Sequence, residues 1–197
     1  MKIGKSFVIA ALGIVLLGYF IISYNSLVES SQQVTASWAQ VQNTYQRRLD
    51  LIPNLVNTVK GYAGHERDTL IAITQARSQA YAAQNKLSEN VPSPQELQQL
   101  EQAQANLGSA LGRLMVIVER YPDLKANQNF LALQAELAGS ENRISVERRR
   151  YNEAVQNYNI RVQRFPGLLM AKIFGFKPQA YFQADNKAQR VPEVKFN

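Results

Sequence analysis

Residues 97–118 read LQQLEQAQANLGSALGRLMVIV, with an apolar seam that recurs at alternating steps of three and four. The positions on the seam are Leu97, Leu100, Gln104, Leu107, Leu111, Leu114 and Val118. This spacing puts all of them on one face of an α-helix, whereas a half-buried strand would alternate apolar and polar residues strictly. The stretch therefore predicts a long amphipathic helix that buries its apolar face against other helices.

Three further stretches have helical spacing, and strand signals are absent. Their seams are Val34, Trp38, Val41, Tyr45, Leu49 and Ile52; then Leu55, Val59, Tyr62, Glu66, Leu70, Ile73 and Arg77; and finally Phe130, Leu133, Leu137, Ile144, Tyr151, Val155, Tyr158 and Val162. Prolines separate the stretches, and proline ends helices because it lacks a backbone N–H. We therefore predict an all-α chain with an antiparallel four-helix bundle of long helices over residues 27–164 and loops near 50–54, 86–95 and 119–126.

An apolar run precedes these helices. Residues 7–22 read FVIAALGIVLLGYFII, contain no charge, and together with their flanks to Tyr24 approach the ~20 residues that a spanning helix needs. The run ends without the small residues of a signal-peptide cleavage site, so we predict an uncleaved transmembrane signal anchor over 7–24, after a short basic N-terminus over 1–6. Lys2 and Lys5 predict a cytoplasmic N-terminus and a bundle outside the membrane, in the periplasm or beyond the cell.

Residues 165–197 comprise an apolar segment followed by a polar tail. Residues 168–177 read LLMAKIFGFK, and an even number of helix crossings returns this segment to the bilayer. Two placements stay open: the segment lies among the lipid headgroups, or it covers the open end of the bundle. The predicted membrane-interface residues are Lys2, Lys5, Tyr19, Tyr24, Leu168, Leu169, Ile173, Phe174 and Phe176.

The prolines leave a second arrangement of the helices open. If Pro53 and Pro122 bend helices instead of ending them, the chain forms one hairpin of two very long helices, and its tip, near 88–94, lies far from the bilayer. In the four-helix bundle that tip returns to the membrane. Two helix starts are also predicted: Ser93 followed by proline caps the third helix, and Asp123 caps the fourth.

The composition excludes most catalytic and metal chemistry. The 197 residues include no cysteine and one histidine, and carry a net charge of +7. Disulfides, thiol nucleophiles and zinc sites built from cysteines or several histidines are therefore impossible. His65 and Glu66 do not form a zincin motif, because position 69 is threonine and no second histidine exists. We predict a protein that is not an enzyme, without metal, cofactor or small-molecule substrate, and without nucleic acid because basic and acidic residues are interleaved.

Several segments together resemble the LemA family. They are YQRRLDLIPNLV at 45–56, the continuation to His65 and Glu66, YPDLKA at 121–126, ENRI at 141–144, Tyr151-Asn152, and FGF at 174–176. The similarity runs from the anchor to about residue 182. It implies a single-pass protein of the bacterial inner (cell) membrane with a helical bundle and no agreed biochemical activity. The family-motif positions are Arg47, Arg48, Asp50, Pro53, Asn54, His65, Glu66, Tyr121, Pro122, Asp123, Glu141, Asn142, Arg143, Tyr151 and Asn152.

The polar motif residues have a structural interpretation. Tyr151-Asn152 repeats seven residues later as Tyr158-Asn159, so both pairs face the same side of one helix. We interpret these residues and the charges around Pro53 as polar layers that set the register between helices. The predicted function is a non-enzymatic scaffold or adaptor that binds copies of itself or other membrane proteins. The alternative is a membrane-shaping or lipid-binding oligomer that uses residues 165–178 and Arg148–Arg150.

Overall fold

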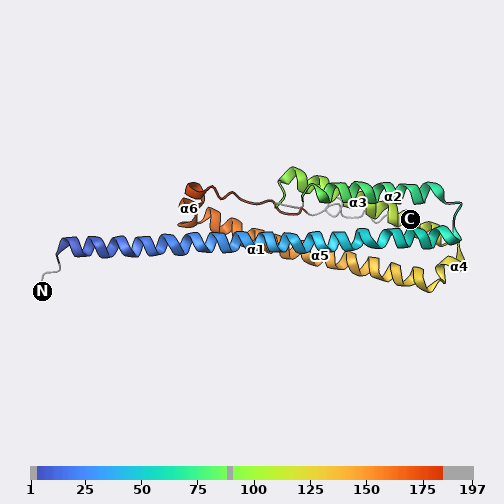
Figure 1. Ribbon diagram of the computed structural model, residues 1–197, viewed down its shortest axis with the longest axis horizontal. Coiled ribbons are helices and arrows are strands. Elements are labelled where there is room, and N and C mark those ends of the chain that lie inside the picture. Colours follow the sequence, from blue (N-terminus) through green and yellow to red (C-terminus); the bar gives the residue numbers. More distant parts are fainter. Residues whose placement is uncertain (1–3, 88–90, 184–197) are drawn as a thin grey trace, which may run out of the picture.

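The computed structural model describes residues 4–87 and 91–183, and all the regular structure in them is helical (Figure 1). The helices are α1 (Lys5–Tyr62), α2 (Arg67–Asn85), α3 (Pro94–Val118), α4 (Pro122–Lys125), α5 (Gln128–Gln163) and α6 (Gly167–Phe174). No strand occurs among these described residues, so the prediction of an all-α chain is confirmed.

Helix α1 joins the predicted anchor to the packed domain without interruption. It contains 58 residues and continues through Pro53. The predicted loop at 50–54 is therefore wrong, and the first turn lies at residues 63–66. In this respect the structure follows the alternative in which Pro53 lies inside a long helix, whereas Pro122 begins the separate helix α4.

The helix tolerates Pro53 because another helix satisfies the carbonyl that the proline leaves free. Residue 53 has no N–H to donate to the carbonyl of Leu49, four residues earlier. The Nε of Arg77, on α2, donates to this Leu49 oxygen at 2.8 Å. At the position where an isolated helix would end, a hydrogen bond thus links α1 with α2.

Helices α1 and α5 pair along most of the domain, and α2 and α3 form a shorter hairpin beside them (Figure 1). The hairpin starts at the end of the molecule that carries α4, which we call the distal end. At its tip, the Leu87 carbonyl accepts bonds from Trp38 Nε1 at 3.4 Å and Gln42 Nε2 at 2.9 Å. The tip therefore stops roughly 21 Å short of Tyr24 along α1, at 1.5 Å per residue.

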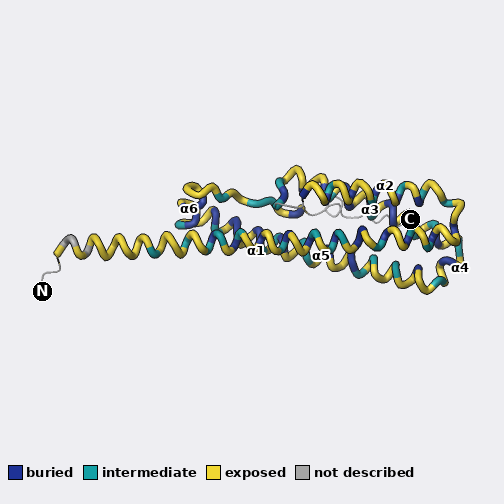
Figure 2. The backbone as a smooth tube through the Cα atoms, in the orientation of Figure 1, coloured by how far each residue is buried: buried dark blue, intermediate teal, exposed yellow. Residues whose placement is uncertain are grey.

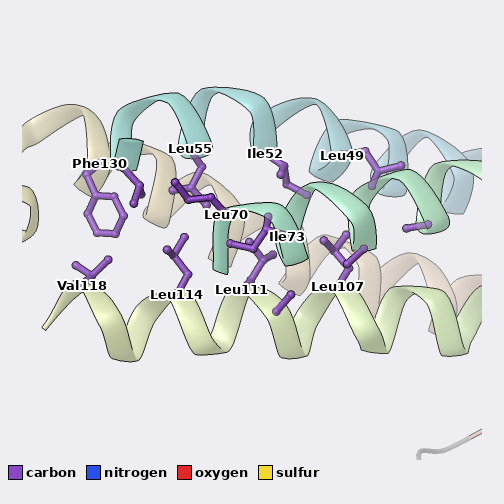
Figure 3. Close-up of a cluster of buried hydrophobic side chains, with 14 of the residues drawn as sticks. Leu49, Ile52, Leu55, Leu70, Ile73, Leu107, Leu111, Leu114, Val118 and Phe130 are labelled. Atoms are coloured by element: carbon purple, nitrogen blue, oxygen red, sulfur yellow. The ribbon is translucent and has the colours of Figure 1, made fainter. Parts of the chain in front are cut away.

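The core consists of two clusters. The distal cluster combines all four long helices, with Leu49, Ile52 and Leu55 of α1 facing Ile73 of α2 and Leu114 of α3 (Figure 3). In the proximal cluster, α1 and α5 pack with α6 and with the chain after it, through Val34, Trp38, Tyr151, Val155, Met170 and Phe182. The predicted four-helix bundle over 27–164 is not confirmed, because the described residues form six helices and the α2–α3 hairpin, whose Leu97 and Leu100 also reach the proximal cluster, is shorter than α1 and α5.

The predicted seam on α3 is confirmed, since all seven of its residues are buried. Its cap is also confirmed: Ser93 accepts a bond from the Glu96 N–H, and the Glu96 carboxylate accepts from the Ser93 N–H, with Pro94 at the first helical position. The predicted cap at Asp123 is wrong. Asn127 caps α5 through a bond from the Phe130 N–H, because the four-residue helix α4 intervenes.

Among the described helices, α1 alone is long and apolar enough to cross a membrane, with a mean hydropathy of 1.8 in its best window. Its described large apolar side chains from Phe7 to Tyr24 are 37–72% exposed (Figure 2). The first buried large apolar side chain is that of Leu27. Except near Tyr24, which contacts Phe174, the described part of the chain leaves this apolar surface exposed, as expected if lipid surrounds this part of α1.

Candidate functional site

A polar cleft of about 370 Å³ opens between α3 and α5 above α1. Two ion pairs line it: Arg48 Nη1 lies 2.9 Å from Glu141 Oε2, and Arg148 Nη2 lies 2.5 Å from Glu101 Oε1. Each pair joins α5 to another helix. The motif residues Arg48 and Glu141 therefore form a contact that links α1 with α5.

The floor of the cleft is more buried than its rim. Only 8% of the Arg48 side chain is exposed, whereas 56% of its partner Glu141 is. Gly108 of α3 lies close to the guanidinium: an added Cβ there would be 3.4 Å from Arg48 Nη2, in van der Waals contact. Burial also raises the pKa of Tyr45, beside Arg48, to about 12. A desolvated cation and a neutral phenol thus lie side by side.

Gln104 contributes an unsatisfied amide to this cleft. Both polar atoms of its side chain are buried and have no hydrogen-bond partner within the described chain. Unpaired buried amides are costly, so such a group is expected to bind water or a polar ligand. No cluster of metal-binding side chains occurs among the described residues.

The Tyr-Asn repeat on α5 binds the chain that follows α6. Asn152 donates to the Phe182 carbonyl at 3.0 Å and accepts from the Phe182 N–H at 2.9 Å. Asn159 makes the same pair of bonds with Gln179, at 2.9 and 2.8 Å. Each side-chain amide thus pairs with both backbone groups of one residue. We call residues 177–183 the tail strap.

The two tyrosines complete this clamp. Tyr151 Oη donates to the Ala180 carbonyl at 3.1 Å, and Tyr158 Oη donates to the Lys177 carbonyl at 3.0 Å. Burial raises the pKa of both hydroxyls, which keeps them protonated as donors. The repeat therefore fixes the tail strap on α5 through backbone atoms, and does not set the register between two helices as the sequence interpretation held.

Phe182 is the buried side chain of the strap. Its ring lies 5.4 Å from Tyr151 and 6.2 Å from Trp38, centroid to centroid, and the Arg148 guanidinium lies 4.4 Å above it. Arg148 thus contacts both the strap and Glu101 of the polar cleft. The strap and the cleft are adjacent parts of one surface along α5, where Gln183 lines the cleft.

Other motif residues meet at the distal end. Glu66 Oε1 accepts bonds from Tyr121 Oη and from Arg120 Nη2, each at 3.0 Å, and the bond to Glu66 raises the pKa of Tyr121. Pro122 starts α4, and His65 is exposed in the turn that precedes α2. These contacts connect the two distal turns, 63–66 and 119–121.

The remaining motif residues lie on the surface. Arg47 Nη2 is 3.6 Å from Glu136 Oε2, and Asp50 accepts a bond from Gln46 at 2.7 Å. Exposed side chains are those of Asp50, Asn54, Asp123, Asn142 and Arg143. The structure therefore divides the predicted motif positions among the cleft, the clamp, the distal turns and the solvent-facing surface.

Most of the predicted membrane-interface residues lie on α6 or beside it. Phe174 packs against Tyr24, with ring centroids 4.7 Å apart, and Phe176 lies 6.1 Å from the same ring. One face of α6 is buried through Met170 and Ala171, while the exposed residues are Leu168, Leu169, Ile173 and Phe174. Helix α6 thus covers the core, as the second placement predicts, while the placement among the lipid headgroups stays a prediction that the exposed apolar side chains allow. Lys2 lies outside the described residues, and Lys5 begins α1.

The basic residues near α6 differ from those named in the sequence prediction. Arg148 pairs with Glu101, Arg149 with Glu153 at 3.9 Å, and Arg150 with Glu147 at 2.7 Å. Arg150 is also about 21 Å along α5 from Arg164, at 1.5 Å per residue. The arginines that lie next to the anchor are Arg161 and Arg164, which the sequence prediction did not name.

Comparison with known proteins covers the same part of the chain. A model of the LemA family matches residues 37–196, which include the cleft, the clamp and α6. The chain belongs to the LemA family. The resemblance of its motif segments to this family is thereby confirmed.

Three similar proteins illustrate the range of the LemA family. Magnetosome protein MamQ 2 of Paramagnetospirillum magneticum is 29% identical over 196 residues, covering 89% of this chain and 71% of that protein. Magnetosome protein MamQ of Magnetospirillum gryphiswaldense is 26% identical over 178 residues, covering 81% and 64%. Protein LemA of Metamycoplasma hominis is 27% identical over 167 residues, covering 85% and 71%. These LemA-family relatives and the apolar part of α1 are consistent with a membrane-associated helical protein.

Several functional contacts were missing from the sequence interpretation. Asn159, Gln104, Arg77 and Arg161 were not named as site residues, although the seven-residue repeat of Tyr-Asn and the proline inside a helical pattern were visible. The repeat indicates a shared face but not what the face contacts. A proline in a long seam indicates a free carbonyl but not its donor.

Proposed function

We propose that this LemA-family protein is a non-enzymatic membrane-anchored scaffold, which binds copies of itself or other membrane proteins through the outer faces of its helices. The observation that carries the proposal is the continuity of α1. One helix of 58 residues links the apolar anchor rigidly to the distal core. A rigid connection fixes the height and orientation of the helix faces relative to the bilayer, which a flexible linker would not do.

The outer surface supports this role. Exposed apolar side chains remain on the α2–α3 hairpin and on α5 after folding, among them Ile71, Tyr81, Val116, Leu131 and Ile160. Large exposed apolar residues are common at protein interfaces, where their burial stabilises association.

Co-isolation of two tagged forms of the full chain tests the scaffold. The two forms are expressed together, cross-linked in intact membranes and extracted in mild detergent. We expect one tag to co-purify the other form or one reproducible membrane protein, whereas a single-pass protein without this domain and expressed at the same level does not. Recovery of the monomer alone after cross-linking would reject the scaffold.

We also propose that the N-terminus is cytoplasmic and the helical domain lies on the other side of the membrane. The chain contains no cysteine, so single cysteines at Ser109 and Gln183 report their own accessibility. A membrane-impermeant maleimide should label both positions in intact cells once it has passed any outer membrane. Labelling only after lysis would place the domain in the cytoplasm and redirect the search for partners.

A second candidate function is membrane shaping, and the geometry of α6 favours it. Its exposed Leu169 and Ile173 lie beside the end of the anchor, where Tyr24 packs on Phe174. A short amphipathic helix at this level inserts as a wedge into one leaflet. In liposomes that contain the full chain, the paired change Leu169→Ser and Ile173→Ser should abolish tubulation, while Ile71→Ser and Val116→Ser should not. Equal tubulation by both double variants would exclude α6 as the wedge.

A further inference from the structure

A cleft of about 310 Å³ lies where the anchor leaves the membrane. One wall is the last turns of the apolar part of α1, and the opposite wall is the turn from α5 into α6. Arg161 and Arg164 supply the cationic groups of the lining, and Tyr19, Ile22 and Phe165 supply apolar surface. No acidic residue lines this cleft, so its charge is of one sign.

The two arginines differ from the other arginines of α5. Within the described residues, neither Arg161 nor Arg164 forms an ion pair, whereas Arg148, Arg149 and Arg150 all do. Arg161 Nη1 instead donates to the Ser26 carbonyl at 3.0 Å and to Ser26 Oγ at 2.7 Å. These bonds fix the guanidinium against α1, and no carboxylate in the part of the chain that the structure describes pairs with it.

The turn that carries Arg164 and Phe165 is tightly packed. Gly167 lies so close to α5 that an added Cβ would be 2.0 Å from the Arg161 carbonyl oxygen. Only glycine fits there without a shift of the backbone. The turn therefore holds Arg164 beside Arg161 and places Phe165, which is 70% exposed, at the rim of the cleft.

We propose that this cleft binds the phosphate headgroup of an anionic phospholipid. The inference rests on the proposed placement of α1 in the bilayer, which puts Tyr19 and Ile22 at the depth of the acyl chains and Ser26 at the depth of the phosphates. Guanidinium groups bind phosphate through charge-assisted hydrogen bonds. A ligand that fits both walls must have a phosphate and an apolar tail, and a membrane lipid has both.

Native mass spectrometry of the full chain tests this site. The protein is extracted in mild detergent and titrated with phosphatidylglycerol or phosphatidylcholine. We expect the first phosphatidylglycerol to bind preferentially to the wild type and about fivefold more weakly to Arg164→Gln, since a surface charge contributes on the order of 1 kcal/mol. Arg161→Lys, which keeps the charge but loses the planar fork, should also weaken binding.

Lys177→Gln is the matched control, because Lys177 is an exposed cation at the same end but does not line the cleft. It should bind phosphatidylglycerol as the wild type does. If Lys177→Gln and Arg164→Gln weaken phosphatidylglycerol binding equally, the effect comes from net charge alone and the proposal is overturned. Equal binding of phosphatidylglycerol and phosphatidylcholine would overturn it as well.

Two further outcomes separate the sources of phosphate and the two proposals. If millimolar inorganic phosphate displaces the bound lipid, the cleft is a free-phosphate site and the lipid assignment is wrong. If Arg164→Gln loses the lipid but still co-isolates its tagged copy or its membrane partner, the lipid site is independent of the scaffold. If the wild-type chain binds the lipid but co-isolates neither its tagged copy nor a membrane partner, the scaffold is rejected and the lipid site stands.

Discussion

At the scale of single residues, the fold depends on side chains that satisfy backbone groups left open by the helices. Arg77 replaces the hydrogen bond that Pro53 cannot make, and Asn152 and Asn159 bind the backbone of the tail strap. Unpaired backbone groups are costly when buried, so each such contact fixes the position of one segment against another.

Replacing Arg77 by methionine should destabilise the protein by about 1–3 kcal/mol, because the Leu49 carbonyl loses its donor. Pro53→Ala restores an N–H at the position that normally bonds this carbonyl. The cost of Arg77→Met should therefore be smaller in the Pro53→Ala background, as urea unfolding of all four proteins in detergent will show. Arg113→Met, an exposed change on α3, serves as the control. An identical cost of Arg77→Met in both backgrounds would exclude the proposed link to Pro53.

Tyr45 should contribute to the loss of stability at alkaline pH. Burial raises its pKa from 10.0 to about 12, so the folded state holds the proton more tightly than the unfolded chain. This contribution to stability is fully present below pH 10.0 and is lost as the pH rises through about 12, by about 1.4 kcal/mol per pH unit between the two values.

Urea unfolding across this pH range should therefore show a shallower loss of stability in Tyr45→Phe than in the wild type. Tyr81→Phe changes a half-exposed tyrosine on α2 and should leave the slope unaltered. Parallel slopes for Tyr45→Phe and the wild type would mean that the Tyr45 hydroxyl ionises as readily in the fold as in the unfolded chain.

At the scale of elements, α5 contacts different partners along its length. Its first turns pack against the distal core through Phe130, its middle lines the polar cleft, and its last turns bind the tail strap. The two asparagines lie seven residues apart on the helix and bind residues that are three apart in the strap, Gln179 and Phe182. The distance between the two asparagines along α5 therefore matches the length of three residues of extended chain. Two helical turns span about 10.5 Å, close to the reach of three extended residues.

Asn152→Ala should loosen the tail strap without unfolding the helices. The amide N–H of Phe182 loses its acceptor, and we expect its hydrogen exchange to accelerate by about tenfold, the effect of one lost hydrogen bond of ~1.4 kcal/mol. Trp38 fluorescence should change as well, because Phe182 packs against this tryptophan, the only one in the chain.

Asn157→Ala, an exposed change on the same helix, is the matched control for this experiment. Asn152→Asp keeps an acceptor for the Phe182 N–H but cannot donate to the Phe182 carbonyl, so its effect should be intermediate. If exchange at Phe182 is unchanged in Asn152→Ala, the side-chain amide does not hold the strap.

At the scale of the whole molecule, α1 determines the shape. From Tyr24 to Tyr62 the helix covers about 57 Å at 1.5 Å per residue, so the distal turns lie far from the bilayer if α1 stands upright. Helix α6 and the cationic cleft lie at the opposite end, beside the anchor (Figure 1). If α1 spans the bilayer as proposed, the distal end stands clear of the membrane and the end that carries α6 lies beside it.

A fluorophore at a single cysteine should report this separation in reconstituted vesicles. Brominated lipids quench only at short range, so a label at Ile173 on α6 should be quenched and a label at Gly64 in the distal turn should not. Quenching at both positions would show that the domain lies flat on the membrane, and quenching at neither would show that α6 stands clear of it.

From the sequence alone, the helices could be predicted because their cause is local. The seam of α3, the cap at Ser93 and the apolar run from Phe7 to Ile22 depend on residues close together in the chain, and the structure has the helix, the cap and the exposed apolar surface there. The LemA motifs likewise depend only on residue order.

Only the tertiary structure decided what the helices contact. Pro53 is a helix breaker by its own chemistry, and the carbonyl that it leaves free, that of Leu49, accepts a bond from Arg77, 28 positions further along the chain. The strap on α5 and the cleft beside the anchor likewise join segments far apart in sequence. Such contacts follow from the summed packing of the whole domain, and a local pattern of residues does not encode them.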